Sequence, residues 1–436
     1  MREKKLGFWE AFSIGVGGMI GGGIFAVLGL TIDLAKGAAP IAFLIAGFIA
    51  LITAYSYAKL SVKFPSEGGS IEYIVQAYGN NLFSAVVNNL LLMSYVIMLS
   101  LYASAFGSYG SALIMGHEVS WLQKTLAVFV IVIFVLINLL GAYITGKTED
   151  ILVYTKVGIL LFFVILGFFT AEHFERLSPE YWESFIKIVT GGLVIFLAYE
   201  GFELIANAAK DVENPEKTLP KAFYASVIFV MFLYVSIAIV TIANVDFETV
   251  KKAQDYVLAI AAEPILGKAG FVIIAIAAMV STASAINATI YGAGRAGYLI
   301  AKLGEIPKEF AKRIKNGYEG MIILGLLAII FATSFNIENI SVAGSFGFLL
   351  IFGLVNYANY KLREITGANP FLALLGAVLC LLSAGVLIGY NLINNPSALQ
   401  SSFWAVFGVV VFTIIYQKFG KKMQPVLDEE LRAKLQ

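Results

Sequence analysis

The chain has 436 residues, of which 59% are hydrophobic and only 14% are charged. A soluble domain has about 25% charged residues, and a water-soluble fold with this surplus of apolar side chains would expose large apolar patches, which soluble proteins avoid. The formal net charge of +1 gives no electrostatic reason to expect a nucleic acid partner. With Cys380 as the single cysteine and only two histidines, a disulfide framework and a Cys/His metal site are excluded, and no cofactor is predicted. The composition and charge therefore predict a polytopic membrane protein.

Twelve apolar stretches are long enough to form membrane helices, each of which needs about 20 mainly apolar residues. In chain order they cover residues 12–35, 40–62, 84–112, 124–145, 150–171, 190–209, 221–244, 268–301, 319–336, 340–360, 371–390 and 402–419. The sequence therefore predicts an all-α polytopic membrane protein with twelve transmembrane helices, surrounded by the lipid bilayer.

Lysine and arginine are distributed unevenly over the loops between these stretches. With the N-terminus placed inside, 22 of the 30 Lys and Arg residues lie on the inner side and 7 on the outer side, and Lys156 lies within a span. Cytoplasmic loops carry an excess of positive residues. We therefore expect a multi-pass protein of the cell membrane with both termini in the cytoplasm.

The first and sixth spans contain residues that do not suit a continuous membrane helix. Three consecutive glycines occupy positions 21–23 of the first span, and a helical glycine costs about 1 kcal/mol relative to alanine. Close helix packing through GxxxG spacing is one interpretation, but the uninterrupted glycine run favours unwinding. In the sixth span, Glu200, Gly201 and Glu203 interrupt an apolar run. Paired interrupted helices are typical of transporters that bind their substrate at the bilayer midplane.

Because the second interrupted span comes five spans after the first, the sequence predicts an inverted five-plus-five repeat. The first repeat is expected over residues 1–171 (helices 1–5) and the second over 187–361 (helices 6–10). Helices 11 and 12 follow within 371–419, and residues 420–436 form a cytoplasmic tail.

Four groups of motifs carry a resemblance to a known family. They are GGMIGGGIF at 17–25; YAKL at 57–60 with FP at 64–65 and GG at 68–69; YEGFE at 199–203 with ENP at 213–215; and NATIYG at 287–292. In order and spacing the sequence resembles the amino acid–polyamine–organocation (APC) transporter superfamily, and within it the archaeal proton-coupled amino acid transporters. The resemblance implies a LeuT-like fold with helices 1 and 6 broken, and transport of amino acids by alternating access.

The substrate is expected between the two broken helices. Free backbone N–H groups at a half-helix N-terminus favour a carboxylate, and unwound carbonyls nearby can receive an ammonium, as the resemblance also implies. The expected substrate-binding residues are Met19, Ile20, Gly21, Gly22, Gly23, Phe196, Tyr199 and Glu200. Ordinary helix packing would equally explain Phe196 and Tyr199. For Glu200, contact with the substrate ammonium, proton coupling, helix capping and a functionless place in a polar cavity all remain open.

Lys156 lies about six residues into the fifth predicted span, at a depth of about 9 Å for a rise of about 1.5 Å per residue. From composition alone, its side chain could instead extend to the cytoplasmic surface. In the family that the chain resembles, a fifth-helix lysine stands where sodium-coupled relatives hold Na⁺. The resemblance therefore implies proton coupling at Lys156, with Gly17, Ser281 and Ser284 around it.

The predicted function is secondary active amino acid transport, with protons as the coupling ion in symport. The alternative is a sodium-independent amino acid exchanger or a polyamine carrier, because a lysine at this place also occurs in exchanging members. Polyamines would favour more acidic residues in the central spans than Glu200 and Glu203. A membrane enzyme would need more nucleophile, base or metal-ligand candidates, and a channel would show rings of charge or repeated filter loops.

Overall fold

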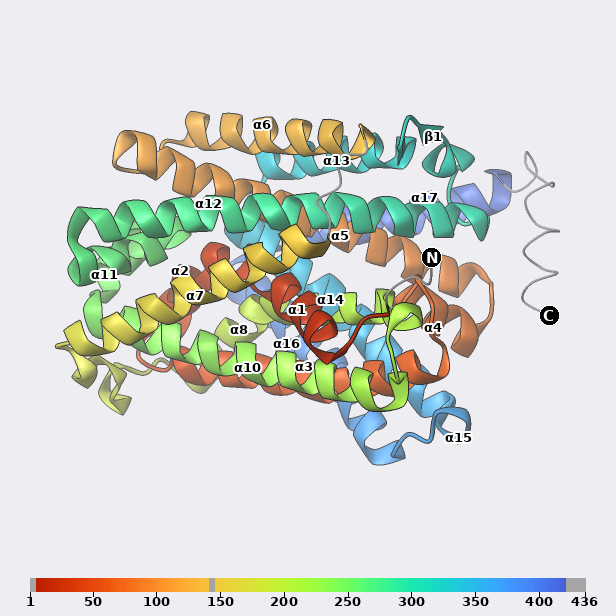
Figure 1. Cartoon of the computed structure of the whole chain (residues 1–436), viewed down its shortest axis with the longest axis horizontal. Helices are drawn as coiled ribbons and strands as arrows, with labels where there is room; N and C mark the ends of the chain where they lie inside the picture. The colour runs from red at the N-terminus through yellow and green to blue at the C-terminus, as the bar shows by residue number, and fades with distance from the viewer. Residues whose placement is uncertain (1–4, 141–145, 421–436) are drawn as a thin grey trace.

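A computed structural model describes residues 5–140 and 146–420. Its long helices run roughly along the longest dimension of the molecule (Figure 1). Within the described residues, ten helices are long and apolar enough to cross a membrane, and the bent pair α1 (Phe8–Met19) and α2 (Gly23–Ala35) adds an eleventh span. The apolar helix α13 (Glu319–Ser334) is shorter, at 16 residues. The predicted all-α polytopic membrane protein is confirmed, and each predicted span contains a helix.

The other long helices follow the predicted spans in order. They are α3 (Ala39–Lys63), α5 (Leu82–Met115), α6 (Ser120–Leu139), α7 (Gly146–Thr170), α8 (Phe185–Ile195) with η3 (Phe196–Glu203) and α9 (Leu204–Asn207), α10 (Pro215–Asn244), α12 (Val257–Lys302), α14 (Ile337–Lys361), α16 (Pro370–Asn394) and α17 (Gln400–Ile415).

Short elements form the connections. They are α4 (Ser70–Tyr78), η1 (Phe174–Leu177), η2 (Pro179–Tyr181), η4 (Ala209–Asp211), α11 (Phe247–Lys252), η5 (Gln254–Tyr256), η6 (Lys308–Ala311), α15 (Arg363–Thr366) and η7 (Pro396–Leu399). A short π-helix, η8 (Tyr416–Gly420), follows α17. A hairpin of β1 (Arg313–Ile314) and β2 (Gly317–Tyr318) pairs antiparallel between α12 and α13, with Arg313 opposite Tyr318.

Several predicted boundaries differ from the observed helices by four to six residues or more; α8 begins at Phe185, where 190 was expected, and α10 at Pro215, where 221 was expected. The fourth span was expected over 124–145, whereas α6 ends at Leu139, and positions 141–145 lie outside the described residues. The eighth span was expected from 268, whereas α12 begins at Val257. Gly267 interrupts α12 with a φ of 65°, a conformation that favours glycine. The predicted start therefore coincides with this break, and the preceding turns form a separate helical segment.

The burial pattern separates inner from outer helices. In the most apolar 18 residues of the α8–α9 segment, 89% of the residues are buried, and in those of α5 78% are buried. In the corresponding stretches of α7, α16 and α17, only 33% of the residues are buried. The outer helices expose large apolar side chains such as Phe169 (84% exposed) and Ile393 (81%). This exposure suits lipid, because hydrocarbon chains do not penalise apolar side chains. In Figure 1, α1, α8 and α14 lie in the middle of the molecule, with α3 and α10 on one side and α6 and α13 on the other.

Candidate functional site

The first predicted span is broken where the glycine run lies. Helices α1 and α2 meet at an angle of 49° across Ile20–Gly22. A Cβ on Gly21 would lie 2.9 Å from the Cβ of Ala285, and one on Gly23 would lie 2.6 Å from the Cβ of Ala198. Both interpretations of the run therefore hold, because the helix is interrupted and the glycines also allow close packing at the break.

The sixth span is also irregular. Between α8 and α9, all eight residues of η3 (Phe196–Glu203) form a 3₁₀ helix, and 3₁₀ runs longer than three or four residues are uncommon. Ser345 of α14 supports its start, because the Ser345 hydroxyl donates to the Val194 carbonyl at 2.9 Å and accepts from the Leu197 N–H at 3.1 Å. A side chain from another helix thus replaces hydrogen bonds that a regular helix would supply itself.

The two irregular segments touch each other. A Cβ on Gly18 would lie 2.6 Å from the carbonyl oxygen of Gly201, so the two backbones are in direct contact. Tyr234 of α10 lies beside this contact. Its hydroxyl lies 2.7 Å from the Met19 carbonyl and 3.3 Å from the Ala198 carbonyl, to which it donates. One buried hydroxyl therefore joins the end of α1 to η3.

A small cavity of about 40 Å³ lies next to this junction. Its lining residues come from α1, α5, α7, the η3–α9 segment and α12: Gly17, Gly18, Tyr95, Tyr102, Val153, Lys156, Glu200, Leu204, Asn207, Ser284, Ala285, Ala288, Thr289, Gly292 and Ala293. Ligand pockets usually have volumes of about 300–1,000 Å³. The helices must therefore separate before this cavity can hold an amino acid.

Four of the residues expected from the sequence meet in this cavity, namely Gly17, Lys156, Glu200 and Ser284. Lys156 is only 5% exposed, so its side chain stays inside the bundle and does not reach the surface. Ser281, also expected near Lys156, lies against the break, where its hydroxyl is 3.1 Å from the Ile20 carbonyl and 2.5 Å from the Gly21 carbonyl.

The two carboxyl groups of η3 differ in their partners. Glu203 is 2% exposed, and Tyr95 donates to its Oε1 at 2.6 Å. Its Oε2 lies 3.1 Å from the Ser70 hydroxyl and 3.3 Å from the Tyr57 hydroxyl, which are 2.5 Å apart. Since these two hydroxyls have one proton each, at least one of them donates to Glu203. Glu203 thus ties η3 to α3, α4 and α5.

Glu200 is 6% exposed, and its Oε2 has no hydrogen-bond partner among the described residues. A buried polar atom without a partner costs about 1–3 kcal/mol, and more when it is charged. The Glu200 carboxyl lines the cavity, so its unused bonding capacity lies at the place where a ligand or a proton would enter.

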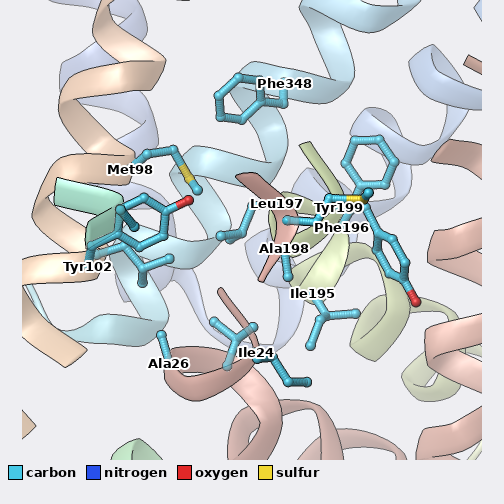
Figure 2. Close-up of a cluster of buried hydrophobic side chains, with 14 of the residues drawn as sticks. Ile24, Ala26, Met98, Tyr102, Ile195, Phe196, Leu197, Ala198, Tyr199 and Phe348 are labelled. Atoms are coloured by element: carbon cyan, nitrogen blue, oxygen red, sulfur yellow. The ribbon is translucent and has the colours of Figure 1, made fainter. Parts of the chain in front are cut away.

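The remaining expected substrate residues do not line the cavity. Met19, Ile20, Gly21, Gly22 and Gly23 form the break beside it. Phe196 packs against Phe352 with ring centroids 5.9 Å apart, and the Tyr199 hydroxyl donates to the Phe43 carbonyl at 3.0 Å. Figure 2 shows Phe196 and Tyr199 on one side of the 195–198 segment, with Met98 and Tyr102 on the other.

Several polar residues at the site were not predicted from the sequence. Tyr95, Tyr102 and Tyr109 of α5 recur every seven residues, so they share one helix face. Tyr95 and Tyr102 line the cavity, and the Tyr109 hydroxyl donates to the Phe25 carbonyl of α2 at 3.1 Å. The seven-residue spacing of these tyrosines could have predicted that they face the site together. Tyr234 could not be singled out, because other hydroxyl side chains, such as Ser226 and Ser236, occur in the same span.

An ion-pair cluster lies at the end of the bundle where α4 and η4 lie. Glu67, in the connection between α3 and α4, forms ion pairs with both Lys210 of η4 and Arg295 of α12. Arg295 belongs to α12, which lines the cavity, and Lys210 belongs to η4, which follows the cavity-lining helix α9 in the chain. The cluster therefore joins the segment that follows α9 to α12.

The sequence is similar to known proteins over nearly its whole length. The sequence model of a family described as amino acid permease matches residues 6–415. The uncharacterized protein MJ0609 of Methanocaldococcus jannaschii is 34% identical, with 97% of each chain covered. The inner membrane transport protein YbaT of Escherichia coli is 31% identical, covering 97% of this chain and 98% of its own. The methylthioribose transporter of Bacillus subtilis is 25% identical, covering 96% and 94%.

Proposed function

Because the chain belongs to the amino acid permease family, whose members are membrane transporters and not enzymes, we propose that it carries amino acids by proton symport. The observation that carries this proposal is the burial of Lys156, at 5% exposure, in a cavity shared with both broken spans. A charged group within the membrane is costly and is usually functional.

In the proposed cycle, the substrate carboxylate binds the backbone N–H groups that begin α2, near Gly21, Gly22 and Gly23. The first N–H groups of a helix have no partner within it and carry a partial positive charge. The substrate ammonium binds carbonyl oxygens at the end of α1 and in η3. Lys156 takes up a proton from the side of entry and releases it on the other side, so that its charge changes with each turnover.

The bundle would open alternately to the two sides of the membrane around this site. We place the protein in the cell membrane with both termini in the cytoplasm. The orientation follows from the predicted order of spans, which puts 22 of the 30 Lys and Arg residues on the side of the termini. With this orientation, the Glu67 cluster lies on the cytoplasmic side of the cavity and would close the exit of the substrate.

The first experiment measures uptake of labelled standard amino acids by purified protein in proteoliposomes, with and without an inward proton gradient. Methylthioribose is added as a competitor, because one relative is named for that solute. We expect the gradient to drive accumulation of at least one amino acid without sodium. Uptake that ignores the gradient and requires amino acid inside the vesicles would contradict symport and favour exchange.

The Lys156→Ala variant tests the coupling residue. Proton transfer by a positioned side chain contributes about 10²–10⁴-fold to a reaction, so we expect gradient-driven accumulation to fall by about tenfold or more. Lys124→Ala, which removes an exposed lysine from α6, is the control and should accumulate substrate as the wild type does. Undiminished accumulation by Lys156→Ala would contradict the role of Lys156.

A further inference from the structure

The two glutamates of η3 are placed alike but bonded differently. In a 3₁₀ helix, residues three apart lie one above the other, so Glu200 and Glu203 occupy successive turns of the same face. Two neighbouring carboxylates repel each other, and such a pair is most stable when only one of them is ionised. The hydrogen bonds decide which one this is.

Glu203 has a hydroxyl donor at each carboxylate oxygen, from Tyr95 at Oε1 and from Ser70 or Tyr57 at Oε2. Donors of this kind stabilise the ionised form. The Glu200 Oε2 has no such donor among the described residues. The environment of Glu203 therefore suits a permanent carboxylate, whereas that of Glu200 suits a group that binds and releases a proton.

The ionisable groups around Glu200 are few. Lys156 comes from α7, Tyr95 and Tyr102 come from α5, and Glu203 lies one turn along η3. The lining residues from α1 and α12 bring no ionisable side chain, since they are glycine, alanine, serine and threonine. Lys156 is thus the basic group that shares the cavity with Glu200.

The cavity volume of about 40 Å³ is too small for an amino acid, but it exceeds the roughly 10–15 Å³ that one water molecule requires. Water in a polar cavity of this size can carry a proton between two side chains that line it. The geometry therefore connects a carboxyl group to an amine without requiring direct contact between them.

We propose that Glu200 is a second proton-binding group of the transport cycle, which passes its proton through the cavity to Lys156. In this step the Glu200 carboxylic acid loses a proton and becomes a carboxylate, and the Lys156 amine gains that proton and becomes an ammonium. The reverse transfer, or uptake of a proton from water, restores the acid. This inference rests on the proposed proton symport and adds the donor that supplies Lys156.

The test compares Glu200→Gln with the wild type in two assays on the same proteoliposomes, using the amino acid that the wild type accumulates best. Counterflow, with unlabelled substrate inside and equal pH on both sides, measures binding and the conformational change. Gradient-driven accumulation measures proton coupling. Glutamine keeps the shape of a protonated glutamate but cannot release a proton.

We expect Glu200→Gln to retain counterflow within about threefold of the wild type and to lose gradient-driven accumulation by about tenfold or more. Glu200→Asp, which keeps a titratable carboxyl, should retain accumulation with a shifted pH midpoint. The control Glu180→Gln changes an exposed carboxyl in η2 and should behave as the wild type in both assays.

Two results would overturn the assignment. Unchanged accumulation by Glu200→Gln would exclude a required proton at Glu200. A loss of accumulation together with a matching rise in the KM of counterflow would assign the residue to substrate binding instead. If Glu200→Gln does not fold, as judged by its melting temperature, the pH profile of Glu200→Asp decides, and an unshifted profile contradicts the proposal. A wild type without gradient-driven uptake would instead refute the proposed symport itself.

Discussion

At the scale of single residues, Tyr234 joins the two broken spans. Its hydroxyl donates to the carbonyls of Met19 and Ala198, which belong to the first and sixth spans. The Tyr234→Phe variant would leave these buried carbonyls without that donor, and we expect the free energy of unfolding to fall by about 1–3 kcal/mol. Thermal unfolding in detergent measures the change.

The matched control is Tyr224→Phe in the same helix. The Tyr224 side chain is half-buried and its hydroxyl makes no hydrogen bond within the described residues. We expect its loss to change stability by less than about 0.5 kcal/mol, as for ordinary surface substitutions. Equal effects of the two variants would show that the bridge made by Tyr234 has no special importance.

At the scale of elements, the contact of α1 with η3 depends on two glycines without side chains. A Cβ on Gly201 would overlap the backbone of Gly18, and backbone atoms cannot rotate away as a side chain does. We expect Gly201→Ala to destabilise the protein by about 1–3 kcal/mol, the usual cost of overpacking, and to reduce uptake.

Gly389→Ala is the control at this scale. Gly389 lies within α16, and a Cβ there would have no heavy atom within 4 Å. Alanine is favoured over glycine in a helix by about 1 kcal/mol, so this variant should be as stable as the wild type or more so. Melting temperatures of both variants in one detergent give the comparison.

At the scale of the whole molecule, the Glu67 cluster joins the segment after α9 to α12. Exposed ion pairs contribute about 0.2–1 kcal/mol, and the Glu67 side chain is 33% exposed. Glu67→Gln removes two such pairs, worth up to about 2 kcal/mol together. Since about 1.4 kcal/mol corresponds to a tenfold change in an equilibrium, the variant should raise the opening of the cytoplasmic side by no more than about 25-fold.

Thiol labelling measures this opening. Cys380 is the only cysteine and is buried, so Cys380→Ala gives a background into which Ala288→Cys, at the cavity wall, can be placed. We expect Glu67→Gln to speed labelling from the side of the termini only. The control Glu319→Gln removes an ion pair with Lys312, 3.3 Å away beside the β1–β2 hairpin, and should not change the rate.

The sequence predicted the helices well because the bilayer restricts the backbone. A segment in hydrocarbon must satisfy its own hydrogen bonds, so apolar length alone indicated a helix in each of the twelve spans. The interruptions were equally readable, since neither the glycine run at 21–23 nor Glu200 suits a continuous span. The amino acid permease family and multi-pass membrane class are confirmed, whereas the inverted repeat, the orientation and the coupling ion stay predictions.

The sequence by itself thus determined the class of protein, the order of its helices and the places where two of them break. Only the tertiary structure decided which polar groups meet, because the direction of a side chain depends on how helices pack. It surrounded the Glu203 carboxylate with hydroxyl groups from α3, α4 and α5, at least two of which donate to it, and left the Glu200 Oε2 with no donor among the described residues, although both lie in one short motif. It also directed Tyr199 toward the Phe43 carbonyl and placed Lys156 beside Glu200 in one cavity.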